Sequence, residues 1–217
     1  MRTDIGTVMS VYIKTVKRNG LSLFSLPKEF RTLELCLEAV KQNGFALQYV
    51  PEELKTPELC LTAIKQQGAA LQYVPEKLKT KKLCLEAVES DGLALKYVPE
   101  KLKTKKLCLE AVLRHGWALS FVPGKVITKK MCKKAVEDYG SSLGQVPEDW
   151  ITPALSIKAM KAHSKSSFLV VRCIPKVFLS EKKEVLTDQE LLEKYTREEL
   201  LTSGNAYLRK LGKAENR

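Results

Sequence analysis

Hydrophobic and polar positions recur with a period of 24 residues along most of the chain. The blocks LELCLEAVKQNGFALQYVPEELKT, PELCLTAIKQQGAALQYVPEKLKT and KKLCLEAVESDGLALKYVPEKLKT follow one another without a gap. A fixed period of this length is typical of solenoids, in which each unit buries its apolar face on the next one. Seven copies cover roughly residues 10–180, and they begin at Ser10, Leu33, Pro57, Lys81, Lys105, Lys129 and Pro153.

The pattern inside each copy predicts two helices joined by a turn. In the copy from Leu33, only Glu38 and Lys41 are clearly polar between residues 35 and 41, and so wide an apolar stripe suits a helix between neighbouring repeats. A shorter apolar face follows and ends at Pro51, because the residue before a proline avoids the helical region. The PEELK segment should add one more helical turn. Alternation is absent, so we predict an all-α fold, a short α-solenoid of about seven helix–turn–helix repeats with a C-terminal helical cap.

Threonine and glycine mark the ends of the first helix of each copy. A threonine stands just before the apolar segment, where its hydroxyl can cap free backbone amides. A glycine follows about twelve residues later, and we expect it to end the helix as a left-handed C-terminal cap. The threonines are Thr32, Thr56, Thr80, Thr104, Thr128 and Thr152, and the glycines are Gly20, Gly44, Gly68, Gly92, Gly116 and Gly140.

The repeat divides the chain into three parts. Residues 1–9 are a lead-in, residues 10–180 are the repeat array, and residues 181–217 are a C-terminal helical cap or tail. In this last part, Thr187 with Glu190 and Thr196 with Glu199 both fit capping boxes, which predicts two short helices. Such helices would cover the open end of the array, as solenoids require. The alternative is that this charged segment acts as a translocation signal, which it loosely resembles.

Five of the six cysteines follow the repeat. Cys36, Cys60, Cys84, Cys108 and Cys132 are 24 residues apart, and Cys173 breaks the series. Disulfide and zinc frameworks use short spacings such as CxxC instead. We therefore expect these cysteines to be small, buried, reduced side chains, and we expect no metal. Reduced thiols favour a cytoplasmic protein.

The basic residues are unevenly spread. The chain has 37 Lys+Arg and 25 Asp+Glu, a net charge of +12, and residues 77–134 carry +10 of it. Many of these lysines stand in the first turns of predicted helices, where a cation typically destabilises by about 0.3–1 kcal/mol but attracts phosphate or carboxylate. We therefore predict either a solvated edge or a basic ladder that binds an anion or a partner. Its candidate residues are Lys79, Lys81, Lys82, Lys103, Lys105, Lys106, Lys129, Lys130, Lys133 and Lys134.

An aromatic residue stands two positions before the proline in four of the copies. Aromatic side chains at fixed repeat positions can stack on the bases of single-stranded nucleic acid. Packing between neighbouring repeats is the competing interpretation, and the series stops at Gln145. The candidate stacking residues are Tyr49, Tyr73, Tyr97 and Phe121.

Catalytic chemistry is poorly represented. The chain has two histidines, and nucleophilic catalysis needs one beside a nucleophile. His115 precedes a glycine at a predicted helix end, where a structural role is expected, and His163 lies in AHSKSS close to Ser164 and Ser166. P-loop, GxGxxG, HExxH and EF-hand patterns are absent, so we expect no enzyme, no catalytic residues and no cofactor. The sequence has no apolar run of 18 residues and no signal-peptide pattern at Met1–Ser10, so no transmembrane segment is expected.

The consensus NGxALxYVPExLKTxxLCLEAV resembles a bacterial tandem-repeat domain of unknown function. Proteins with this domain are found in intracellular bacteria and among suspected secreted effectors. The resemblance covers about four-fifths of the chain and implies an all-helical, non-catalytic interaction module without established site residues. The copies after Gly116 depart from the consensus, and residues after Leu179 lie outside it.

These observations predict a non-enzymatic helical-repeat adaptor or scaffold that binds a protein partner. The resemblance adds the possibility of a bacterial effector that is delivered into a host cell. The alternative is a solenoid that uses the lysine ladder of residues 77–134 to bind a polyanion, either nucleic acid or phosphoinositide. A hydrolase centred on His163 is a distant third hypothesis.

Overall fold

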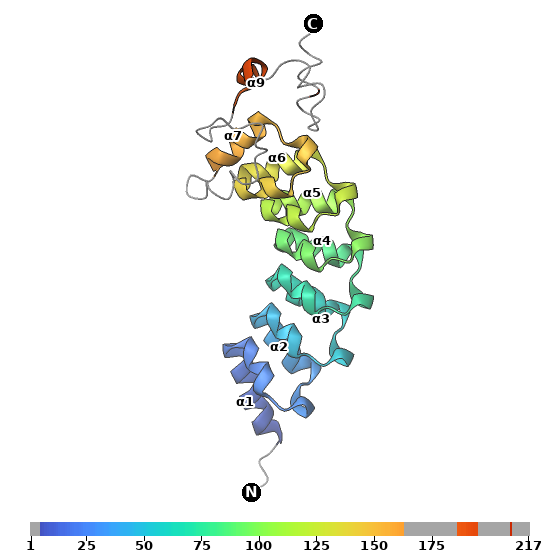
Figure 1. Cartoon of the computed structure of the whole chain (residues 1–217). Helices are drawn as coiled ribbons and strands as arrows, with labels where there is room; N and C mark the ends of the chain where they lie inside the picture. Colours follow the sequence, from blue (N-terminus) through green and yellow to red (C-terminus); the bar gives the residue numbers. More distant parts are fainter. Residues whose placement is uncertain (1–4, 163–185, 195–208, 210–217) are drawn as a thin grey trace. The chain divides into compact units, whose positions relative to one another are not determined.

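The computed structural model describes residues 5–162, 186–194 and 209, and within these ranges the regular elements are all helices (Figure 1). The all-α solenoid predicted from the sequence is confirmed. The chain separates into two compact units, one of residues 1–114 with 121–126 and one of residues 115–120 with 127–217. The α-helices are α1 (Ile5–Arg18), α2 (Leu33–Gln42), α3 (Pro57–Gln66), α4 (Lys81–Ser90), α5 (Lys105–Arg114), α6 (Lys129–Asp138), α7 (Pro153–Ala162) and α9 (Asp188–Lys194).

Each repeat continues from its α-helix into two pieces of 3₁₀-helix. The longer piece has six residues and starts at the glycine, and the shorter one has three residues and includes the helical turn predicted after the proline. The six-residue pieces are η1 (Gly20–Ser25), η3 (Gly44–Tyr49), η5 (Gly68–Tyr73), η7 (Gly92–Tyr97), η9 (Gly116–Phe121) and η11 (Gly140–Gln145). The three-residue pieces are η2 (Lys28–Phe30), η4 (Glu52–Leu54), η6 (Glu76–Leu78), η8 (Glu100–Leu102), η10 (Gly124–Val126) and η12 (Glu148–Trp150).

The predicted threonine caps are confirmed at all six positions. Thr80 Oγ1 accepts a hydrogen bond from the backbone N–H of Leu83 at 3.3 Å, which satisfies one of the free amides of α4. Proline at the first position of α3 and α7 is compatible with this arrangement, since the first amide of a helix lacks a partner within it. The same threonine bond is present at Thr32, Thr56, Thr104, Thr128 and Thr152.

The glycines do not form the predicted left-handed caps, so that expectation is wrong. Helix α2 ends at Gln42, and the next residue, Asn43, has an extended backbone with φ −149° and an N–H that donates to the Ala39 carbonyl. Gly44 then begins η3. The φ angles of Gly20, Gly44, Gly68, Gly116 and Gly140 all lie outside the left-handed range. At Gly68, a Cβ would collide with the Ala87 carbonyl oxygen and lie 2.9 Å from the Asp91 nitrogen. Glycine is therefore needed because the next α-helix approaches so closely.

The core of each unit lies between successive repeats. In the first unit, α2 packs against α1 and α3, and each six-residue 3₁₀-helix contacts the next one. In the second unit, α6 and α7 pack against each other and against η11. In α4, the side chains of Leu83, Cys84, Ala87 and Val88 are buried, and the corresponding four positions are also buried in α2, α3, α5 and α6. The wide apolar stripe is therefore the packing surface.

The C-terminal part contributes one described α-helix. Thr187 and Glu190 form the predicted capping box: the Glu190 amide donates to Thr187 Oγ1 at 3.3 Å, and the Thr187 amide donates to Glu190 Oε2 at 2.6 Å. Leu191 of α9 is fully buried. Thr196, Glu199, Cys173 and His163 lie outside the described residues. Among the described helices, none has the length and apolarity needed to cross a membrane.

Candidate functional site

Two lysines of the predicted ladder are buried and form hydrogen bonds within the fold. Lys79 Nζ donates to Glu76 Oε1 at 2.7 Å and to the Tyr97 carbonyl of the next repeat at 3.2 Å. Lys103 Nζ makes the equivalent bonds to Glu100 Oε1 at 2.6 Å and to the Phe121 carbonyl at 3.1 Å. Their side chains are only 8% and 7% exposed. Lys79 and Lys103 therefore bind groups within the fold and do not present a free ammonium group to an external anion.

These lysines belong to a column of basic residues that ties each repeat to the next one. Arg31 and Lys55 reach the carbonyls of Tyr49 and Tyr73 at 2.8 and 3.1 Å, again 18 residues further along the chain. A buried carbonyl without a partner is unfavourable, so each tie satisfies a backbone group that faces the neighbouring repeat. Ile127 and Ile151 occupy the corresponding positions in the last copies, so the column ends at Lys103.

The remaining predicted lysines lie at the surface. In the first unit, the exposed pairs Lys81–Lys82 and Lys105–Lys106 stand in the first turns of the neighbouring helices α4 and α5. In the second unit, Lys129, Lys130 and Lys133 are exposed on α6, and Lys134 forms an ion pair with Asp138 at 2.6 Å. Apart from Lys134, none of these surface lysines has a hydrogen bond or an ion pair with another described residue.

Two of the four predicted stacking residues pack against an aromatic ring of the preceding repeat. Tyr49, Tyr73, Tyr97 and Phe121 are all half-buried. The Tyr49 ring lies 5.8 Å from that of Phe24 in the preceding repeat, and the Tyr73 ring lies 6.4 Å from that of Phe45. These centroid distances are typical of aromatic pairs, so two of the four rings already have a ring partner within the fold.

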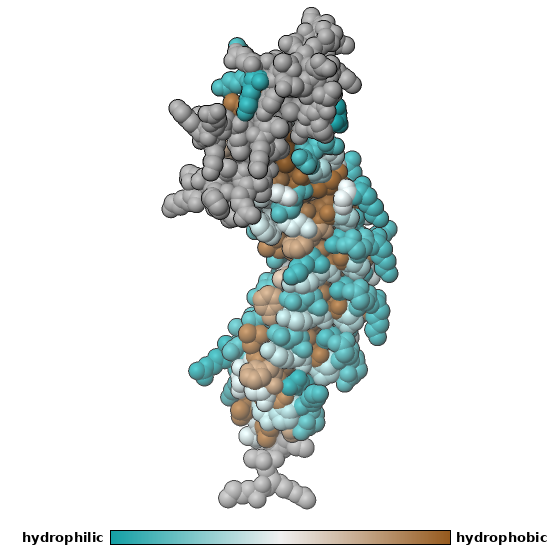
Figure 2. Space-filling model, viewed as in Figure 1, coloured by the Kyte–Doolittle hydropathy of each residue, from teal (hydrophilic) through white to brown (hydrophobic). Residues whose placement is uncertain are grey.

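A small groove recurs at the same place between successive α-helices of the first unit. Between α3 and α4 it has a volume of about 190 Å³ and is lined by Pro57, Glu58, Leu61, Thr80, Lys82 and Leu83. Between α4 and α5 it measures about 140 Å³ and is lined by Lys81, Leu85, Leu102, Thr104, Lys106 and Leu107. Both grooves combine leucines with an unpaired lysine from the first turn of the second helix. Figure 2 shows that hydrophobic patches lie within a largely hydrophilic surface on this face of the repeats.

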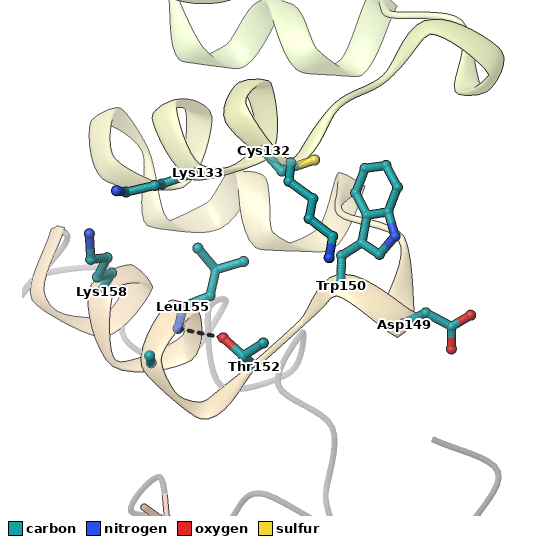
Figure 3. Close-up of a pocket in the computed structure, with 9 residues that line it drawn as sticks. Cys132, Lys133, Asp149, Trp150, Thr152, Leu155 and Lys158 are labelled. Carbon is teal, nitrogen blue, oxygen red and sulfur yellow. Dashed lines mark hydrogen bonds between the residues drawn. The ribbon is translucent and has the colours of Figure 1, made fainter. Parts of the chain in front are cut away.

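The second unit has a larger pocket at the equivalent place between α6 and α7 (Figure 3). Its volume is about 500 Å³. In Figure 3 Leu155 lies between Trp150 and the two lysines Lys133 and Lys158, whose amino groups point to the same side. The Leu155 backbone amide donates to Thr152 Oγ1 at 3.2 Å. The pocket is lined by Lys129, Cys132, Lys133, Asp149, Trp150, Thr152, Ala154, Leu155 and Lys158.

Part of this pocket could be predicted from the sequence. Lys133 stands where earlier copies have Leu61 and Leu85, and it was among the candidate residues. Trp150 and Ala154 were not selected, although they also depart from their repeat positions. Comparison of all variable repeat positions that line one inter-helix groove would have brought these three residues together.

The described cysteine and histidine side chains that could take part in catalysis are buried or packed against other side chains. Burial raises the pKa of Cys36, Cys60, Cys84, Cys108 and Cys132 to about 11, so these thiols stay protonated at neutral pH and are poor nucleophiles. The His115 ring stacks on that of Tyr139 with centroids 5.0 Å apart, and His115 Nε2 lies 3.2 Å from the Tyr139 hydroxyl. Among the described residues, no group of three or more His, Cys, Asp or Glu side chains is arranged to hold a metal ion.

The repeats identify the family of the chain. They match a family described as a domain of unknown function (DUF4116) in four overlapping stretches, at residues 10–55, 32–79, 56–103 and 80–127. The matches cover more than half of the 217 residues, so the chain belongs to this family of tandem helical repeats. No curated protein and no solved structure matched the chain.

Proposed function

We propose that this protein is a non-enzymatic helical-repeat adaptor that binds a protein partner along the grooves between its α-helices. The observation that carries the proposal is the recurrence of one groove, with the same leucine and lysine positions, between α3 and α4 and between α4 and α5. Each of these grooves is too small for a typical ligand, whose pockets measure about 300–1,000 Å³. In series, however, they offer an extended surface of the kind that solenoids use for binding.

The groove chemistry favours an extended segment with acidic and apolar side chains. Packed helices lie about 8–10 Å apart, and an extended chain advances about 3.3 Å per residue, so one repeat corresponds to about three residues of the partner. An apolar side chain could contact Leu61 or Leu85, and a carboxylate could face Lys82 or Lys106. The apolar contacts would supply affinity, and the exposed charges would mainly supply specificity and rate.

A second candidate function is polyanion binding by the same first-turn lysines. It is favoured by one observation: Lys81, Lys82, Lys105 and Lys106 are exposed on neighbouring helices without an ion pair to any described residue. Unpaired cations at helix N-termini attract phosphate groups. Nucleic acid or anionic lipid would then bind through phosphates alone, with little contribution from the leucines.

Affinity capture from bacterial and host lysates, with and without nuclease, tests the two functions. A protein partner should remain bound after nuclease and at about 0.3 M salt, because apolar contacts are not screened, whereas contacts to several phosphates weaken steeply with salt. The double variant Leu61→Gln and Leu85→Gln should release a protein partner but should not reduce retention on heparin or RNA.

Charge reversal supplies the control for this experiment. Glu at positions 81, 82, 105 and 106 suits the helix N-termini, so the folded state should keep or slightly gain stability. A variant with Glu at Lys14, Lys41, Lys65 and Lys161 changes the net charge equally elsewhere on the exposed surface. Equal loss of binding in both variants would reduce the effect to net charge and contradict both site proposals. The adaptor is supported if the protein partner is lost from the charge-reversal variant at positions 81, 82, 105 and 106 and from the leucine double variant, but is retained by the control variant.

We further propose that this protein is of bacterial origin and is located in the cytoplasm. We also propose that it acts as an effector that is delivered into a host cell. These proposals are supported by the resemblance of the repeat consensus to proteins of intracellular bacteria, and the cytoplasmic assignment also by the five free thiols. Fusion of the full chain to a calmodulin-dependent reporter enzyme would detect delivery into infected cells. Absence of reporter signal, with normal expression in the bacterium, would contradict the effector role.

A further inference from the structure

We propose that the pocket between α6 and α7 binds a small aromatic phosphate monoester. This site is distinct from the grooves proposed to bind a protein, because it lies in the second unit and differs from those grooves in size and lining. Its volume of about 500 Å³ falls within the range typical of small-molecule pockets, about 300–1,000 Å³.

Three replacements at repeat positions convert the small groove into this pocket. Ala154 stands where Lys82 and Lys106 line the earlier grooves, so the long side chain at the rim is lost and space opens. Lys133 replaces a leucine, and Trp150 stands at the position of Leu102. Each replacement changes a residue that lines the same groove, so together they alter its size, its charge and its aromatic character.

The charges around the pocket favour a phosphate group. Lys129 and Lys133 line it without a hydrogen bond or ion pair to any described residue. Lys158 also lines it and donates to Glu137 Oε1 at 2.8 Å; this hydrogen bond, together with the charges of Lys158, Lys133 and Lys134, lowers the pKa of the Glu137 carboxyl. Asp149 is the acidic lining residue, and in Figure 3 its carboxylate points away from Lys133 and Lys158. Ammonium groups that have no hydrogen bond or short ion pair to a described residue complement a phosphate monoester, which carries about −1.5 to −2 charges at pH 7.

The other lining residues favour an aromatic group on the ligand. Trp150, Leu155 and Ala154 provide apolar surface beside the lysines. An indole ring is a good partner for a planar ring, since offset stacking and edge-to-face contacts are both favourable. In Figure 3 Leu155 separates Lys133 from Trp150, so a phosphate near Lys133 with the ring near Trp150 would fix the orientation of the ligand, as polar groups do in mostly apolar pockets.

Tryptophan fluorescence of the full chain tests the site. The protein has two tryptophans, and Trp117→Phe removes the exposed one, so Trp150 becomes the reporter. Phenyl phosphate should change the Trp150 emission with saturation, and ligand-detected NMR should show saturation transfer to its ring protons. Inorganic phosphate and benzyl alcohol, which each supply only half of the ligand, should bind at least about tenfold more weakly, a difference of about 1.4 kcal/mol.

Two variants locate the site, and a third controls for charge. Lys133→Leu restores the residue of the earlier repeats, and Ala154→Met fills the opening without a charge; each should weaken phenyl phosphate binding at least about tenfold. Lys130→Leu makes the same charge change at an exposed position of α6 outside the pocket and should leave binding unchanged. Circular dichroism should show that all three variants fold.

The remaining outcomes overturn the proposal. Absence of both signals at about 10 mM phenyl phosphate means that the pocket has no useful affinity for this class. Equal binding of benzyl alcohol shows an apolar site without phosphate recognition, and equal binding of inorganic phosphate shows that the ring contributes nothing. If Lys130→Leu and Lys133→Leu weaken phenyl phosphate binding equally, binding depends only on the overall charge of α6 and not on the pocket.

Discussion

At the scale of single residues, the buried cysteine of each repeat makes the stability of the fold depend on pH. Burial raises the pKa of the Cys84 thiol from 9.0 to about 11, so the folded chain keeps a proton that the unfolded chain releases near pH 9. The stabilisation is complete below about pH 9 and is lost as the pH rises toward 11. The same sign holds at Cys36, Cys60, Cys108 and Cys132.

We therefore predict that alkaline pH destabilises the protein through these thiols. The free energy of unfolding, measured with guanidinium chloride at pH 8 and pH 10, should fall with pH, and Cys84→Ala should reduce the slope by up to about one proton. At pH 8 the five cysteines of the 24-residue series should resist iodoacetamide in the native chain and should react in the denatured chain. An unchanged slope in Cys84→Ala would show that the burial of this thiol does not control proton release.

The sequence predicted such residues well where one position has one role. The cysteine period indicated a buried thiol, and the five described cysteines are buried and free. The lysine positions were harder, because the sequence does not distinguish Lys79, whose side chain is 8% exposed, from the exposed Lys81 two residues later. Their separation depends on the Tyr97 carbonyl, 18 residues further along the chain, which only the folded repeat brings into reach.

At the scale of the helical elements, the glycine column sets how closely neighbouring repeats approach. Gly68→Ala places a Cβ against the Ala87 carbonyl oxygen and 2.9 Å from the Asp91 nitrogen, so backbone atoms of the next repeat must move. We predict a loss of about 1–3 kcal/mol in the free energy of unfolding, the usual range for overpacking. Urea unfolding followed by circular dichroism measures it.

Gly124→Ala is the matched control, since nothing lies within 4 Å of its Cβ position. Hydrogen exchange should place the damage of Gly68→Ala in α3 and α4, because repeats stabilise their neighbours. Native stability in Gly68→Ala would contradict the close approach of α4.

The element scale also shows where local sequence rules failed. The threonine caps depend on a side chain and an amide three residues apart, so the sequence was sufficient to predict them. The glycines also fit a local rule, the left-handed C-terminal cap, but their role is non-local: at Gly68 the atom that excludes a side chain belongs to Ala87, 19 residues later. Tertiary packing, not the end of the helix, determines this position.

At the scale of the whole molecule, the pocket proposed to bind a ligand depends on positions where the repeat changes. The conserved part of each copy builds the groove, and the grooves of the first unit remain small. The α6–α7 pocket combines Lys133, Trp150 and Ala154, which come from two successive copies. The period alone predicted the scaffold, but it could not predict the pocket, because these three residues converge only when one copy packs on the next.

The same dependence on neighbours governs how the array unfolds. Lys79 joins its own repeat, through Glu76 Oε1 at 2.7 Å, to the Tyr97 carbonyl of the next one at 3.2 Å. Lys79→Met keeps the buried aliphatic stem but leaves that carbonyl without its partner, so we predict a loss of about 1–3 kcal/mol. Since each repeat is stabilised mainly by its neighbours, the loss should fall mainly on the free energy with which these two repeats stabilise each other.

Urea unfolding monitored by hydrogen exchange measures this coupling. In Lys79→Met the helices on either side of the broken tie should lose protection at different urea concentrations, whereas the parent chain should lose it more nearly together. Lys79→Arg should preserve the tie, because Arg31 makes the same bond to a carbonyl 18 residues ahead. Lys81→Met removes an exposed, unpaired lysine of the same region and should change stability by less than about 0.5 kcal/mol. If Lys79→Met is as stable and as cooperative as Lys81→Met, the basic column does not couple the repeats.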